Sequence, residues 1–96
     1  MPFAIVLAPE AVADLRRLKS AMRAAVKVAL QTHLRREPQK TSRSRIERLR
    51  GVSRPQYRLR VGEVRVFYDV ADGAVEVLAV VPKSETTAWL AQFGKP

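Results

Sequence analysis

The chain has 96 residues, which is enough for one domain with a single core and too few for two. Eighteen basic residues face nine acidic ones, so the net charge is +9, and thirteen of the basic residues are arginine. There is no cysteine and only one histidine, His33, which excludes disulfides, thiolate metal sites and histidine clusters. We therefore expect a polyanionic partner, either nucleic acid or an acidic protein, and neither a metal nor any other cofactor. A proteome that uses arginine in place of lysine is the plainer explanation of the charge.

The first part of the chain predicts a strand followed by a helical hairpin. Residues 3–9 form an apolar run that ends at a proline, which is typical of a short buried strand. Apolar residues recur at every third position over residues 9–19 and at every fourth over residues 21–36, which predicts two amphipathic helices, the second ended by Pro38. No stretch is long enough to span a membrane, and the N-terminus has no pattern of a secretory signal. We expect a soluble, cytoplasmic protein.

The segment from residue 39 to 55 is polar and strongly basic, with a single acid, Glu47. Ile46 and Leu49 indicate either a turn of helix or a pinned loop, which Gly51 would end. Because arginine binds phosphate bidentately and stacks on bases, the arginines of this segment are candidate RNA contacts. They are Arg43, Arg45, Arg48, Arg50 and Arg54.

The remainder predicts a three-stranded antiparallel meander and a short helix. The strands cover residues 56–61, 64–71 and 74–81, joined by tight turns at Gly62-Glu63 and Asp72-Gly73. Residues 85–93 form a helix that carries Trp89, Leu90 and Phe93 on one face. The element order is β-α-α-β-β-β-α, in which the first strand joins the meander at its edge or its centre. We expect an α+β fold: one domain over residues 1–96, with an antiparallel sheet packed on the helical hairpin.

The turn at Gly62-Glu63 fixes the register of the first hairpin. It pairs Val61 with Val64, so Arg60 lies opposite Arg65 and Arg58 opposite Phe67. Strand alternation turns these four residues away from the helical hairpin. Directly opposed like charges cost up to about 1 kcal/mol. A solvated sheet face is the simple explanation, but arginines clustered beside an aromatic ring favour an RNA-binding surface that includes Phe67.

The second turn extends this outer face. Pairing Ala71 with Ala74 across Asp72-Gly73 places Leu78 opposite Phe67 and Val80 opposite Arg65. The outer face would then have an apolar zone of Phe67, Leu78 and Val80, and the C-terminal helix is the element available to cover it.

These features resemble the RelE/ParE superfamily of toxins from bacterial type II toxin–antitoxin systems. The resemblance rests on the strand and helical hairpin at the start, on "ERLRG" (Glu47 to Gly51), and above all on "YRLRVGEVRVFYDV" (Tyr57 to Val70). It covers nearly the whole chain and looks closer to the RelE branch than to the gyrase-poisoning ParE branch. It implies a small RelE-like fold and a metal-independent endoribonuclease that cuts messenger RNA in the ribosomal decoding site and so inhibits translation.

In such toxins the attacking group is the 2′-hydroxyl of the RNA, and basic residues on the exposed sheet face bind phosphate and stabilise charge. The resemblance assigns these catalytic roles to Arg58, Arg60 and Arg65. The family often has an arginine just after the last strand and a tyrosine near the C-terminus, which this chain does not match. Lys83 is the nearest cation and would replace the arginine, and Trp89 would stack on a base of the RNA.

Arginine is a poor base, because its pKa stays above about 12. The chain offers His33, Glu63 and Asp69 as other proton acceptors. His33 adjoins the apolar stripe of the second predicted helix, where a half-buried structural role is the simpler one, and Glu63 lies in a turn.

The resemblance also implies the partners. These are a cognate antitoxin protein and messenger RNA in the ribosomal A site, with no membrane and no small-molecule substrate. Two other functions remain open from the sequence: a gyrase poison of the ParE type, and a basic nucleic-acid-binding module without activity.

Overall fold

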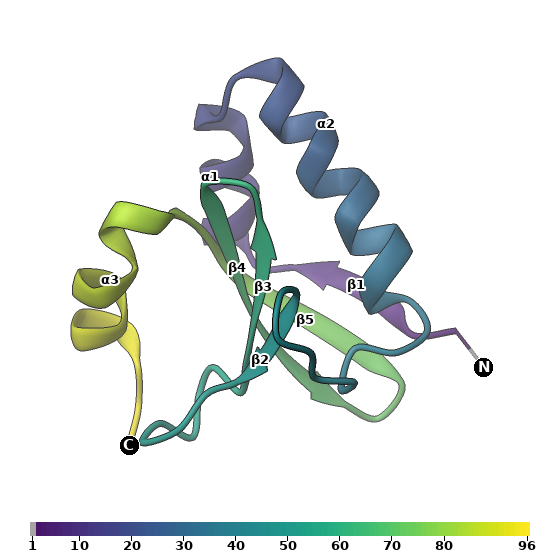
Figure 1. Cartoon of the computed structure of the whole chain (residues 1–96), viewed down its shortest axis with the longest axis vertical. Helices are drawn as coiled ribbons and strands as arrows, with labels where there is room; N and C mark the ends of the chain where they lie inside the picture. The colour runs from purple at the N-terminus through teal and green to yellow at the C-terminus, as the bar shows by residue number, and fades with distance from the viewer. Residues whose placement is uncertain (1) are drawn as a thin grey trace.

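The computed structural model describes residues 2–96 and forms one five-stranded sheet with helices on both faces (Figure 1). The elements, in chain order, are β1 (Ala4–Leu7), α1 (Pro9–Arg17), α2 (Ser20–Ala29), a π-helical extension of α2 (Leu30–Leu34), β2 (Ile46–Arg48), β3 (Tyr57–Val61), β4 (Val64–Ala71), β5 (Ala74–Pro82), a 3₁₀ turn (Lys83–Glu85) and α3 (Thr86–Phe93). The predicted α+β class, helical hairpin, meander and C-terminal helix are confirmed. Within residues 2–96, no helix is both long and apolar enough to cross a membrane.

The main core lies between the sheet and the helical hairpin of α1 and α2. The buried stripe of α2 and its extension, Val26, Ala29, Leu30 and Leu34, packs with the inner residues of the strands. Tyr68 is buried in this core, where its hydroxyl donates a hydrogen bond to the Pro38 carbonyl over 2.6 Å. Pro9 occupies the start of α1, where its missing N–H is not needed.

The strand order is β1-β5-β4-β3-β2, so β1 and β2 are the edges. The meander of β3, β4 and β5 is antiparallel as predicted, and β1 adds to its edge in parallel with β5. The predicted loop or turn of helix at residues 46–49 is wrong, because Ile46–Arg48 pairs with β3 as an edge strand. Ile46 is buried beside Leu59, and this single anchor in a three-residue strand gives no alternation in the sequence.

The predicted register of the first hairpin is confirmed, with Arg60 opposite Arg65 and Arg58 opposite Phe67. The predicted register of the second hairpin is wrong beyond its middle. Tyr68 pairs with Val77 but Phe67 with Ala79, so Leu78 is an extra residue at a β-bulge. Arg65 therefore lies opposite Val81 rather than Val80.

The bulge changes which side chains face outward from β5. Ala79 and Val81, rather than Leu78 and Val80, are buried with Phe67 on the outer face, and Val80 belongs to the main core. The predicted cover is present: Trp89 and Leu90 of α3, with Leu49, pack on this patch. The rings of Phe67 and Trp89 stack with centroids 4.6 Å apart and planes inclined by 6°. Figure 1 shows α3 on the side of the sheet away from α1 and α2.

Candidate nucleic-acid interface

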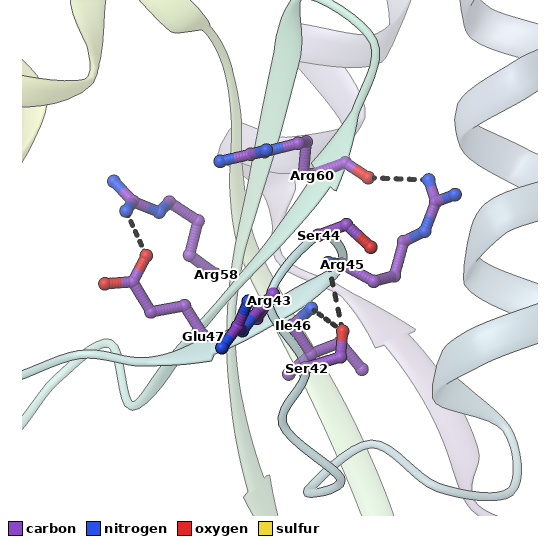
Figure 2. Close-up of a pocket in the computed structure, with 8 residues that line it drawn as sticks. All are labelled: Ser42, Arg43, Ser44, Arg45, Ile46, Glu47, Arg58 and Arg60. Carbon is purple, nitrogen blue, oxygen red and sulfur yellow. Dashed lines mark hydrogen bonds and ion pairs between the residues drawn. The ribbon is translucent and has the colours of Figure 1, made fainter.

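The outer side of β3 carries two arginines, Arg58 and Arg60, which we call the arginine face. Figure 2 shows both side chains extending to the same side of β3, as strand alternation requires. Arg58 is half-buried and forms an ion pair with Glu47, its cross-strand neighbour on β2. Arg60 is exposed, and its guanidinium makes no hydrogen bond or ion pair to any residue from 2 to 96. Arg60 is thus free to bind an anion.

Arg65 shares the outer face but is not on the surface. It is 5% exposed, and its guanidinium donates to the carbonyls of Gly62 (2.8 Å) and Val64 (3.0 Å). Burial lowers the pKa of the Arg65 guanidinium, the charges of Arg60 and then Arg58 lower it further, and Glu63 opposes them. An arginine keeps its proton in spite of such a shift. Arg65 therefore fixes the β3–β4 turn and adds a buried positive charge beneath the arginine face.

The ladder between β4 and β5 brings Lys83 to the same turn. Val64 pairs with Pro82, and the next N–H, that of Lys83, donates to the Glu63 carbonyl over 2.7 Å. Lys83 is exposed. Lys83, the expected replacement for the unmatched arginine of the family, thus lies at the turn that Arg65 fixes.

The loop before β2 is closed by Ser42. Its N–H donates to the Ile46 carbonyl over 2.9 Å, and its hydroxyl accepts from the N–H groups of Arg45 (3.0 Å) and Ile46 (3.4 Å). The closed loop sends its two arginines in different directions. Both arginines line the small hollow beside Arg58 and Arg60, but the Arg45 guanidinium extends to the other side of β3 and donates to the Arg60 carbonyl over 3.2 Å (Figure 2).

The other predicted RNA contacts of this segment are dispersed. The Arg48 guanidinium lies 5.0 Å from the centroid of the Tyr57 ring, on the face of the helical hairpin. Arg54 forms ion pairs with Asp69 (3.5 Å) and Glu76 (3.0 Å), and Arg50 is exposed in the loop after β2. Of the five, Arg43 and Arg45 line the hollow beside the arginine face.

Phe67 and Trp89 stack on each other. Phe67 has 0% exposure beneath Trp89, so it has no surface to offer to a base while α3 is in place. Trp89 is half-buried in the same stack. The prediction that Phe67 contacts RNA therefore does not fit this structure, because the C-terminal helix uses the apolar patch as its own binding site.

The candidate proton acceptors differ in their surroundings and in their distance from the arginine face. Asp69 accepts from the Gln56 N–H over 2.7 Å and pairs with Arg54, and His33 lies on the helical side of the sheet. Glu63 is exposed in the turn next to Arg65. Glu47, which the sequence marks only as the single acid of the basic segment, lines the hollow with Arg58 and Arg60. Glu47 reaches the site because residues 46–48 form a strand that pairs with β3.

The described residues lack a ligand set of the kind that metal ions require. Among residues 2–96 no three His, Asp or Glu side chains gather in a group that could hold an ion. The arginine face itself offers guanidinium groups and the Glu47 carboxylate.

Residues 5–86 match the sequence profile of a family described as "ParE toxin of type II toxin-antitoxin system, parDE". The chain belongs to the RelE/ParE toxin superfamily. It is thus a toxin of a type II toxin–antitoxin system, and the resemblance found in the sequence is confirmed. No curated protein sequence matches this toxin.

Solved structures share the fold of this toxin. A chain of the RelBE2 toxin–antitoxin complex from Mycobacterium tuberculosis is 27% identical over 85% of this toxin and 99% of the solved chain, with a TM-score of 0.70. A mutant of the Escherichia coli toxin RelE in the free state is 23% identical over 93% of this toxin and 92% of the solved chain, also with a TM-score of 0.70. A chain of the archaeal RelE–RelB complex from Pyrococcus horikoshii OT3 is 24% identical over 86% and 97%, with a TM-score of 0.69. The family profile names ParE and these structures name RelE, so the two comparisons point to different branches of the superfamily.

Proposed function

We propose that this toxin inhibits translation by cutting messenger RNA in the ribosomal A site, without a metal, and that the arginine face binds the scissile phosphate. The observation that carries the proposal is the free, exposed guanidinium of Arg60, which lies directly opposite the buried charge of Arg65 and beside Arg58. A phosphate placed there gains charge-assisted hydrogen bonds and relieves the repulsion between the opposed arginines.

The reaction is a transesterification. The 2′-oxygen of the RNA attacks the adjacent phosphorus, the bond from phosphorus to the 5′-oxygen breaks, and a 2′,3′-cyclic phosphate forms. The proton of the 2′-hydroxyl goes to a carboxylate, and the departing 5′-oxygen takes a proton from water. Arg60 and Lys83 stabilise the negative charge that develops on the phosphate oxygens.

Glu47 is the carboxylate we assign as proton acceptor. It is exposed and ion-paired with Arg58 at the edge of the hollow, so it can reach a substrate held by the arginine face. The pair also fixes the orientation of both side chains, because each is the cross-strand neighbour of the other. Glu47→Gln would retain the size of the side chain and replace the basic carboxylate with an amide that does not take up a proton.

The open shape of the site supports dependence on the ribosome. Within residues 2–96, the hollow beside the arginine face has a volume of about 20 Å³, which is too small to enclose a nucleotide. In-line attack by a 2′-oxygen requires an aligned backbone, which contributes a large part of the rate in such reactions. The ribosome, by holding the message in the A site, would supply that alignment.

The partner that silences the toxin would be an antitoxin with an acidic or amphipathic segment. Several of the similar solved structures are toxin–antitoxin complexes. Carboxylates from such a segment would pair with Arg60 and compete with phosphate for the arginine face.

Gyrase poisoning is the second candidate function, and the family profile that names ParE favours it. It requires no cut in RNA, and it would use the basic surface to bind a protein–DNA complex. The two functions differ in the nucleic acid that is damaged in the cell.

The test is inducible expression of three forms: the wild type, Arg60→Gln, and Arg16→Gln as a matched control on the exposed side of α1. We expect the wild type to arrest growth and produce codon-phased cuts in a reporter message, mapped by primer extension. Loss of one charge-stabilising donor typically costs about 100-fold in rate, so Arg60→Gln should relieve toxicity while Arg16→Gln does not. Growth arrest with intact messages and cleaved gyrase–DNA complexes would instead establish the second function.

A further inference from the structure

A second basic pocket lies on the helical side of the sheet and shares Ser42, Arg45 and Ile46 with the hollow beside the arginine face. It is formed between the π-helical extension of α2 and the loop that precedes β2, with a volume of about 340 Å³. Its polar lining includes Thr32, His33, Arg36, Lys40, Ser42 and Arg45. We call it the loop pocket.

We propose that the loop pocket binds a backbone phosphate of a second RNA segment, separate from the one cut at the arginine face. This inference rests on the proposed function, since it adds a further contact with RNA to the same toxin. Three cations, Arg36, Lys40 and Arg45, line the pocket against one carboxylate, Glu37. Glu37 already pairs with Lys40 over 3.5 Å, so the pocket retains an excess of positive charge. Hydroxyl groups complete a donor set that suits phosphate.

Arg45 is the best-placed ligand. Its guanidinium donates once, to the Arg60 carbonyl over 3.2 Å, and makes no other hydrogen bond to the described chain from residue 2 onward. Its backbone is held by the closed loop at Ser42, which fixes the guanidinium on the helical side of β3 (Figure 2). Fixing this arginine in advance reduces the entropy lost when a phosphate binds.

His33 shows the charge imbalance within the pocket. Burial, and then the charge of Arg45, lower the pKa of the His33 imidazole below its ordinary value. The other charged groups lining the pocket are Arg36, Glu37 and Lys40, so the cations outnumber the single carboxylate around the imidazole. An anion bound between His33 and Arg45 would reverse this, because an opposite charge nearby favours the protonated imidazole.

The geometry favours a separate RNA segment over the cut strand itself. Figure 2 shows the guanidinium groups of Arg60 and Arg45 extending to opposite sides of β3, although both residues line the small hollow beside the arginine face. A phosphate in the loop pocket would then anchor the toxin while the arginine face acts on the message.

The test uses His33 as a reporter, since it is the only histidine in the chain. Its pKa is measured by NMR titration of the imidazole Hε1 resonance in the full-length toxin, alone, with inorganic phosphate, with a single-stranded RNA oligonucleotide and with polyglutamate. We expect phosphate and RNA to raise the His33 pKa by about one unit, which corresponds to about tenfold tighter binding of the protonated form. Polyglutamate should have a smaller effect.

Two variants keep the result specific. Arg45→Gln should abolish the response to phosphate and to RNA, whereas Arg16→Gln, on the exposed side of α1, should retain it. Arg45→Gln should also weaken sedimentation of the toxin with ribosomes severalfold. An unchanged His33 pKa with phosphate and RNA would overturn the proposal, and an equal rise with polyglutamate would replace RNA with an acidic protein. Neither result depends on whether Arg60→Gln abolishes cutting, so the two proposals fail separately.

Discussion

The stack of Trp89 on Phe67 makes a quantitative prediction about how α3 is held. Replacing Trp89 with Ala exposes the Phe67 ring and removes a stack whose centroids are 4.6 Å apart. A fully buried Trp→Ala change costs about 3–5 kcal/mol, and the stacking itself about 1 kcal/mol beyond area burial. Because Trp89 is only half-buried, we expect a loss of about 2.5 kcal/mol, or roughly 10–20 °C in Tm for a domain of this size.

Phe93→Ala is the matched control for this prediction. Phe93 is 54% exposed, and its ring lies 5.6 Å from that of Trp89 with the planes inclined by 41°. Its removal should cost less than about 1 kcal/mol. Thermal unfolding followed by circular dichroism measures both variants. Equal losses, or no loss for Trp89→Ala, would refute the view that the stack holds α3 on the sheet. Weakened RNA binding with an unchanged Tm would return Trp89 to the RNA-binding role expected from the sequence.

Three further substitutions test the framework of the site, each by thermal or denaturant unfolding. Tyr68→Phe should cost about 1–2 kcal/mol, because it leaves the buried Pro38 carbonyl without its donor. Burial, and then Tyr57, raise the pKa of the Tyr68 hydroxyl above its ordinary value, so the unfolded chain loses this proton first as pH rises. The free energy of unfolding of the wild type should therefore fall above about pH 10 by up to about 1.4 kcal/mol per pH unit, and Tyr68→Phe should lack this contribution. The same dependence of stability on pH in both proteins above about pH 10 would contradict this. Asp14→Ala should cost about 1.5 kcal/mol, because the Asp14 carboxylate accepts from the Val80 N–H beyond the bulge over 2.9 Å, and Asp14→Asn should recover part of it. Arg54→Gln should change stability by less than about 1 kcal/mol, because the Arg54 side chain in both ion pairs is about half exposed; a larger loss would show that the pairs hold the loop in place.

The first hairpin was predictable to the residue, because its turn sequence and strict alternation leave one register. The register of the second hairpin was not predictable, because a bulge at Leu78 shifts the pairing by one residue. Val80 and Val81 are both buried in the shifted register, so their apolar character does not indicate the shift. Its sequence, apolar at nearly every position, does not say which face each residue takes. The edge strand β2 was missed because three residues with one buried anchor give no period.

The candidate site was predictable in part for a similar reason. Alternation assigns a side chain to a face of the sheet but does not give its depth, so it placed Arg65 on the outer face without showing that Arg65 is buried under its neighbours. Chain proximity grouped Arg43 with Arg45, yet only Arg45 reaches the Arg60 carbonyl and also lines the loop pocket. Glu47 entered the site only through its pairing with Arg58 across two strands.

The most direct test of the central claim is a cleavage assay with purified components. A message is presented to the toxin alone and on ribosomes programmed with a defined A-site codon, and the products are mapped at single-nucleotide resolution. We expect the wild type to cut within the A-site codon only when ribosomes are present, Arg60→Gln to cut about 100-fold more slowly, and Arg16→Gln to match the wild type. An intact message on wild-type-treated ribosomes, or equal cutting by wild type and Arg60→Gln, would contradict the assignment of the arginine face as the site of RNA cleavage.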